Sequence, residues 1–170
     1  LQALDSLSST FPSDQIIIVE YHLAGAGFVD AYAAPESADR YAILATTNRG
    51  VPDVFFNGVQ ARAQGASSAR TAALRYRTAL QTKAGDIAHF TIAAKKSISA
   101  AGIEINTSIA RLGSSGFSQF GVLALVWEDL TTAGHHHVVR KAFAPENYSG
   151  IAAGETKSMR FEGSVPGVRD

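Results

Sequence analysis

Hydrophobic positions follow two different periods along the chain, and the period changes near the middle. At the start, leucines at positions 1, 4 and 7 repeat at helical spacing and Pro12 closes that segment. The unbroken apolar run from Ile16 to Val19 predicts a strand that is covered on both faces, as in the middle of a parallel sheet. The first half of the chain therefore begins as a helix followed by a buried strand.

A helix and a second strand are expected next. Residues 36–46 predict a short helix with Pro35 near its first turn. The run from Asp53 to Phe56 predicts a short buried strand directly after a proline. Because a helix-length segment separates the two strands, we expect residues 16–19 and 53–56 to pair in parallel.

A hairpin and another helix complete the first half. Asn57-Gly58 is a strong hairpin signal, so residues 59–64 are the expected return strand. Ser67 or Ser68 can cap a helix that runs to about Gln81. The boundary of the first domain is expected shortly after this helix, near residues 82–86.

The second half changes to short β-like runs that are separated by Gly, Ser and Pro. Evenly spaced runs of this kind favour a sandwich or barrel over βαβ units. The pattern therefore predicts two domains, residues 1–83 and residues 84–170. The five runs cover residues 87–99, 102–112, 119–129, 136–144 and 156–165.

Composition narrows the classes of function. Lys plus Arg and Asp plus Glu are equal at 15 each, so a basic surface for nucleic acid is not indicated. The longest apolar run is far too short to span a bilayer, so no transmembrane segment is expected. The 170 residues contain no cysteine, which excludes disulfides and thiolate metal sites among them.

Two ordered motifs resemble one group of proteins. The first is Ile-Ile-Ile-Val-Glu-Tyr-His at 16–22, followed after a helix by Gly-Val-Pro-Asp-Val-Phe-Phe-Asn-Gly at 50–58. The second is Val-Trp-Glu-Asp at 126–129, followed by His-His-His-Val-Val-Arg at 135–140. In this order they resemble thioredoxin-like envelope proteins of the outer-membrane lipoprotein type, which join a thioredoxin-like half to a β-sandwich half.

The resemblance implies an α/β plus all-β fold. It implies an incomplete thioredoxin-like domain followed by an immunoglobulin-like β-sandwich, with a cis peptide bond between Val51 and Pro52. In the family, a first strand and a Cys-x-x-Cys turn precede the first helix, and neither is found in these 170 residues. Because thiol–disulfide exchange requires a thiolate, these residues by themselves cannot perform it.

The leading hypothesis for function follows from the absence of a Cys-x-x-Cys motif in these residues. We expect a non-catalytic protein of the cell envelope, periplasmic or extracellular, that binds other proteins or serves as an accessory subunit without a cofactor. An alternative is a thiol–disulfide oxidoreductase whose Cys-x-x-Cys lies upstream of Leu1. Both hypotheses rest on the resemblance and on the missing dithiol.

This hypothesis has two sets of candidate residues, one for peptide binding and one at an unpaired sheet edge. Val51 and Pro52 are the candidate peptide-binding residues, because a cis proline presents backbone groups to an extended segment; the alternative is that Pro52 only shapes the turn. The edge from Ile16 to Val19 carries no charge and no proline, so it needs a cover. We expect that cover to be a protein partner or an N-terminal segment outside these residues.

Histidines supply a third hypothesis, a copper or zinc binder. His135 and His137 would share one face of a strand, because consecutive side chains of a strand point to opposite faces. The simpler interpretation is a hairpin turn with half-exposed histidines. Glu20 and His22 also point the same way at a strand end, where they form either an acid–base pair or a structural pair.

Overall fold

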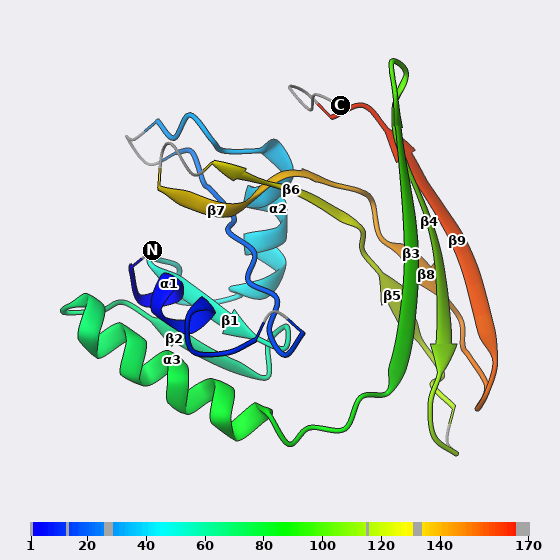
Figure 1. Cartoon of the computed structure of the whole chain (residues 1–170), viewed down its shortest axis with the longest axis horizontal. Helices are drawn as coiled ribbons and strands as arrows, with labels where there is room; N and C mark the ends of the chain where they lie inside the picture. The colour runs from blue at the N-terminus through cyan, green and yellow to red at the C-terminus, as the bar shows by residue number, and fades with distance from the viewer. Residues whose placement is uncertain (1, 13, 26–28, 115, 131–133, 166–170) are drawn as a thin grey trace. The chain divides into compact units, whose positions relative to one another are not determined.

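The computed structural model describes all residues except 1, 13, 26–28, 115, 131–133 and 166–170 (Figure 1). Over the described ranges the chain has a mixed α/β fold, with three helices and mostly antiparallel, open sheets. It divides into two compact units. The first unit comprises residues 1–86 and 128–138, and the second comprises residues 87–127 and 139–170.

The first unit confirms most of the predicted elements. Its helices lie where leucine spacing, Pro35 and the Ser68 cap place them, and the Ser68 side chain accepts a hydrogen bond from the backbone N–H of Thr71. The peptide bond between Val51 and Pro52 is cis, as predicted. The elements are α1 (Gln2–Ser8), α2 (Pro35–Leu44), β1 (Asp53–Phe56), β2 (Ala61–Gln64) and α3 (Ala69–Lys83).

The hairpin of β1 and β2 is antiparallel, with Phe56 opposite Ala61. Asn57 and Gly58 both have positive φ angles, 45° and 75°, which is the backbone conformation that the Asn-Gly signal predicts. The strands then join the helices in one core. Its buried members are Ala3, Leu7, Phe56, Ala63, Ala72 and Tyr76.

The prediction of a central strand at residues 16–19 is wrong. This segment belongs to no strand, and β1 pairs only with β2 over the described ranges. The apolar run is covered on one side only: Ile16 and Ile18 pack against the core, whereas Ile17 is 77% exposed. An unbroken apolar run therefore does not require cover on both faces here.

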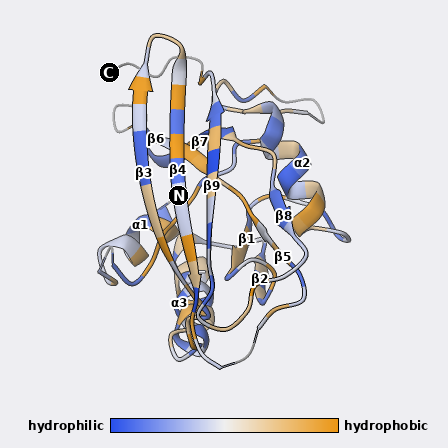
Figure 2. Cartoon of the chain, turned by 90° about the vertical axis from the view of Figure 1, so that its right-hand side faces the viewer, coloured by the Kyte–Doolittle hydropathy of each residue, from blue (hydrophilic) through white to orange (hydrophobic). Residues whose placement is uncertain are grey.

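The second unit is built on a three-stranded antiparallel sheet in the order β3-β4-β9. Hydrophobic and hydrophilic residues alternate along much of β4 and β9 (Figure 2), and this alternation places Ile103, Ile109 and Phe161 in the core of this unit. A short ladder of β5 and β8 is also present. The bounds are β3 (Phe90–Ser99), β4 (Gly102–Arg111), β5 (Phe120–Val122), β8 (Glu146–Tyr148) and β9 (Thr156–Gly163).

One hairpin is divided between the units. Strands β6 (Leu125–Leu130) and β7 (His135–Ala142) pair with one another. The range 128–138, which includes the end of β6 and the beginning of β7, belongs to the first unit. There the backbone N–H of Glu20 donates a hydrogen bond to the carbonyl of His137 at 2.9 Å, within a parallel bridge between Glu20 and Val138. The sequence pattern assigns all of these residues to the second domain, so this return to the first unit is a finding of the structure.

Two further observations concern the exposure of Trp127 and the length of the helices. Trp127, which belongs to the second sequence motif, is 45% exposed and is not among the buried core residues. Within the part of the chain that is described, no helix combines the length and the hydropathy that crossing a bilayer requires.

Candidate functional site

The first unit contains an apolar groove of about 720 Å³. Residues 15–23 form one wall and residues 51–58 form the other, and the three helices contribute side chains that include Leu7, Leu44 and Tyr76. Val51 and Pro52, the predicted peptide-binding residues, both line this groove and are exposed. The groove thus brings together the two segments that the sequence analysis singled out.

Both walls of the groove are formed by consecutive residues of the chain. Each residue from 15 to 23, and each from 51 to 58, lines the cavity in turn. In extended chain, successive side chains point to opposite sides, so a side-chain face would contribute only every second residue. We infer that the groove is bordered by the edges of two backbone segments.

The wall that carries the cis proline is fixed by a network around Asp53, whose side chain is 2% exposed. Its carboxylate accepts hydrogen bonds from Arg62 Nε at 2.9 Å and from the Tyr41 hydroxyl at 2.8 Å. Arg62 also donates to the carbonyls of Thr47 and Asn48. The loop before Pro52 is therefore held against β1.

Tyr21 and Arg40 are two of the polar residues that line the groove. Burial raises the pKa of Tyr21, although a hydrogen bond with Arg40 opposes this shift, so the phenol stays neutral at physiological pH. The Nε atom of Arg40 is buried and has no hydrogen-bond partner within the described structure. These groups offer hydrogen bonds to a molecule in the groove.

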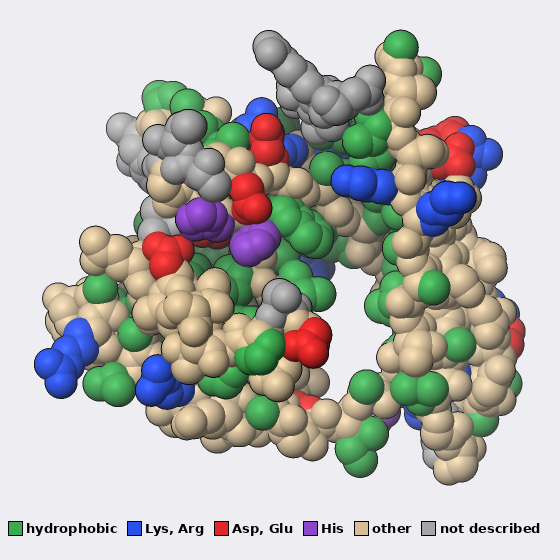
Figure 3. Space-filling model, viewed as in Figure 1, with side chains coloured by type: hydrophobic (Ala, Val, Ile, Leu, Met, Phe, Trp, Pro, Cys, Tyr) green, Lys and Arg blue, Asp and Glu red, His purple; other side chains and the backbone are tan. Residues whose placement is uncertain are grey.

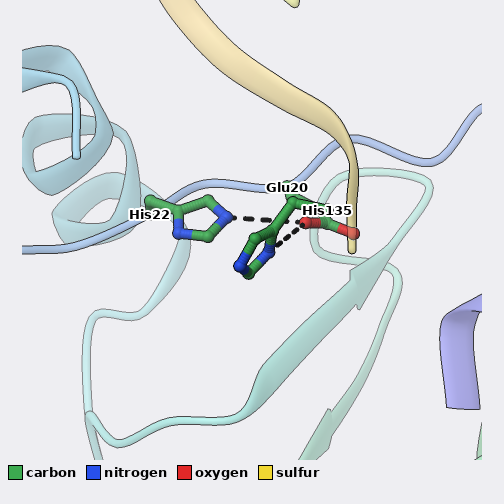
Figure 4. Close-up of side chains that lie close together, drawn as sticks. All are labelled: Glu20, His22 and His135. Carbon is green, nitrogen blue, oxygen red and sulfur yellow. Dashed lines mark hydrogen bonds and ion pairs between the residues drawn. The ribbon is translucent and has the colours of Figure 1, made fainter. Parts of the chain in front are cut away.

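At one end of the groove, two histidines converge on a buried glutamate (Figure 4). Glu20 and His22 come from the wall segment, and His135 is the first residue of β7. The bridge between Glu20 and Val138 explains why residues so distant in sequence meet. The exposed fractions of the three side chains are 7%, 11% and 20%, and Figure 3 shows histidine side chains beside acidic ones on this unit.

Asp30 fixes the orientation of one imidazole. His22 Nδ1 lies 2.8 Å from Asp30 Oδ2, and the backbone N–H of Tyr32 donates to Asp30 Oδ1 at 2.9 Å. Burial would raise the pKa of Asp30, but these hydrogen bonds outweigh it and hold the pKa below its ordinary value. An ionised Asp30 accepts a hydrogen bond from Nδ1–H of His22, so that Nε2 is directed toward Glu20.

The contacts inside the cluster are long for hydrogen bonds. Glu20 Oε2 lies 3.5 Å from His22 Nε2 and 3.6 Å from His135 Nδ1. Hydrogen bonds between nitrogen and oxygen are normally about 2.7–3.2 Å. His135 Nδ1 is buried without a hydrogen-bond partner in the described structure. The three donor atoms lie within 4.8 Å of one another, so these residues are able to hold a metal ion.

Only one of the two histidines of the predicted site belongs to the observed cluster. His135 joins the cluster, whereas His137 lies beside Asp129, whose Oδ1 is 3.9 Å from His137 Nε2 and accepts the backbone N–H of His137 at 2.8 Å. His137 has a φ of 56°, which interrupts the alternation of side chains on which the prediction of a shared face relied.

Glu20 and His22 do point the same way, as predicted, whereas Asp30 and the partnership with His135 were missed. The short spacing of Glu20 and His22 is visible in the sequence, and it was the signal for the first two members. Nothing in the local pattern links either residue to β7, because that contact depends on tertiary structure. Comparison of the chain with models of protein families, with characterised proteins and with solved structures gave no match.

Proposed function

We propose that the first unit binds an extended apolar polypeptide segment in its groove, and that the chain acts as a non-catalytic protein-binding or accessory subunit of the cell envelope. The proposal includes a thioredoxin-like arrangement for the first unit and an immunoglobulin-like arrangement for the second. Support for the fold comes from the order of helix, cis proline, hairpin and helix, followed by antiparallel strands. The observation that carries the function is that two unbroken runs, residues 15–23 and residues 51–58, line the groove.

Backbone edges favour a strand as the occupant. The β1 strand has a ladder partner only on the side of β2 over the described ranges, so its other edge is able to pair with an added strand. Main-chain hydrogen bonds of this kind supply affinity, and pockets for alternate side chains supply specificity. A volume of about 720 Å³ suits a short segment of chain, because pockets for small ligands span about 300–1,000 Å³.

The chemistry of the lining favours an uncharged, apolar segment from a partner protein. The groove is lined mainly by aliphatic and aromatic side chains, and Ile17 is exposed beside it. Burial of one aliphatic side chain contributes about 1.5–3 kcal/mol, so two or three such residues give useful affinity. Charged residues in the middle of the segment would lose hydration wherever they face the aliphatic and aromatic part of the lining.

A library of random peptides tests this proposal. We expect the purified chain to select peptides with alternating β-branched or aromatic residues, and hydrogen exchange to slow at β1 and at residues 16–19 when such a peptide binds. The Ile17→Lys variant should weaken binding of a selected peptide about tenfold or more in fluorescence anisotropy. Lysine there introduces a charge beside the apolar groove.

Val59→Lys is the matched control. Val59 is 67% exposed but does not line the groove, so its replacement should leave peptide affinity unchanged. Selection of no peptide, or slowed exchange only in β3 and β4, would rule out strand binding in the groove. If a longer natural polypeptide binds no added peptide while these 170 residues do, the occupant is a segment of the same chain instead of a partner.

A further inference from the structure

We propose that Glu20, His22 and His135 form a binding site for a divalent metal ion of the zinc class. The two imidazoles and the carboxylate supply nitrogen and oxygen ligands from two distant parts of the sequence, and all three belong to the first unit. This site does not depend on peptide binding in the groove. Its support comes from the spacing and the surroundings of the three donor atoms.

The spacing of the donor atoms matches tetrahedral coordination. Bonds from zinc to His nitrogen and to carboxylate oxygen are about 2.0–2.2 Å, so two ligands of a tetrahedral ion lie about 3.4 Å apart. The observed separations from Glu20 Oε2 are 3.5 Å to His22 and 3.6 Å to His135. Octahedral Mg²⁺, with bonds of about 2.0–2.1 Å, requires neighbouring ligands about 3.0 Å apart.

Direct hydrogen bonding explains the cluster less well. A carboxylate that accepted a charge-assisted hydrogen bond from each imidazole would lie about 2.7–2.9 Å from each nitrogen. Instead, His135 Nδ1 is buried and lacks a hydrogen bond. Because buried polar atoms are normally satisfied, an atom of this kind that faces a carboxylate and a second imidazole points to a shared ligand.

Metal-binding histidines commonly donate the N–H of their other ring nitrogen to a carboxylate, and Asp30 is in the position to accept such a bond from His22. Its contact with His22 Nδ1 leaves Nε2 on the side of Glu20, where a lone pair is needed for coordination. The Tyr32 ring lies 5.6 Å from the His22 ring and 5.2 Å from the His135 ring, centroid to centroid. The two imidazoles are thereby held by packing as well as by the carboxylate.

The ligand set selects the class of metal. Imidazole suits zinc, copper, nickel and iron, whereas Mg²⁺ and Ca²⁺ prefer oxygen ligands alone. Three protein ligands leave one tetrahedral position for water or another donor. We therefore assign Zn²⁺ as the ion, with Co²⁺ as its spectroscopic substitute.

Calorimetric titration of the intact 170-residue chain with Zn²⁺ tests the site. We expect one ion per chain, tetrahedral d–d absorption bands with Co²⁺, and no heat with Mg²⁺. His22→Ala and His135→Ala should each weaken Zn²⁺ binding at least 100-fold, and Asp30→Asn should weaken it about 10–100-fold. Absence of Zn²⁺ binding by the unmodified chain would overturn the proposal without any variant.

His136→Ala and His137→Ala are the matched controls, because both residues follow His135 in β7 but lie outside the cluster. They should leave Zn²⁺ affinity unchanged. Loss of binding in these variants, with full binding in His22→Ala, would place the ion elsewhere and overturn the proposal. Glu20→Gln, which preserves the size of the side chain, provides a third ligand variant, and far-UV circular dichroism of each variant confirms that loss of affinity does not reflect unfolding.

Discussion

Replacing Phe56 with alanine is expected to reduce the free energy of unfolding of the first unit by about 3–5 kcal/mol. The Phe56 side chain is 6% exposed, and its ring lies 6.1 Å from that of Tyr76 across the core of this unit. Alanine removes the ring and leaves a cavity between β1 and α3, which the short hairpin is too small to close. The effect is large because Phe56 is one of only a few large side chains buried in this core.

The helices provide a signal that is specific for this unit. All three helices of the described structure lie within the first unit, so the loss of ellipticity at 222 nm in urea reports on its unfolding. Leu74→Ala is the matched control, since Leu74 lies on α3 and is 58% exposed. Its effect should stay within about 0.5 kcal/mol. Similar midpoints for the two variants would contradict the assignment of Phe56 to the core.

The second large effect is expected at Asp53. Asp53→Ala removes the acceptor for Arg62 and for the Tyr41 hydroxyl, and we expect a loss of about 1–2 kcal/mol, because a hydrogen bond typically contributes about 0.5–1.5 kcal/mol to stability. Tyr41→Phe leaves the Arg62–Asp53 pair in place and removes the hydroxyl's bonds to Asp53 and to the backbone of Gly50. Its effect should be about 1 kcal/mol. The same urea titrations measure both variants.

Asp39→Ala is the control for the loss of a carboxylate. Asp39 is exposed on α2, and its replacement should change stability by less than about 0.5 kcal/mol. An effect of Asp53→Ala no larger than that of Asp39→Ala would show that the network does not hold the loop before Pro52. An effect of Tyr41→Phe equal to that of Asp53→Ala would instead assign most of the stability to the hydroxyl.

Features that depend on local sequence were predictable. The Ser68 cap and the turn at Asn57-Gly58 each follow from a few neighbouring residues, whereas the cis bond at Pro52 was expected from the resemblance. The alternation in β4, where Thr107, Ile109 and Arg111 are buried, likewise reflects the period of two along a strand. For such elements the preferred backbone conformation and the tertiary structure agree.

Features that depend on distant partners were not predictable. The run from Ile16 to Val19 is strand-like in composition, but a strand also requires a neighbouring backbone, and the bridge forms instead at Glu20 with Val138. That bridge in turn decides which histidine meets His22. Because residue 137 has a left-handed backbone, spacing along β7 could not identify the correct histidine.

The division of the β6–β7 hairpin has a consequence for synthesis of the protein. Residues 128–138 belong to the first unit, although residues 87–127 of the second unit are translated before them. At about 5–20 residues per second, the ribosome needs several seconds to pass from residue 86 to residue 138. During that interval the nascent first unit lacks the strand that pairs with Glu20, so its folding is completed only after much of the second unit has been made.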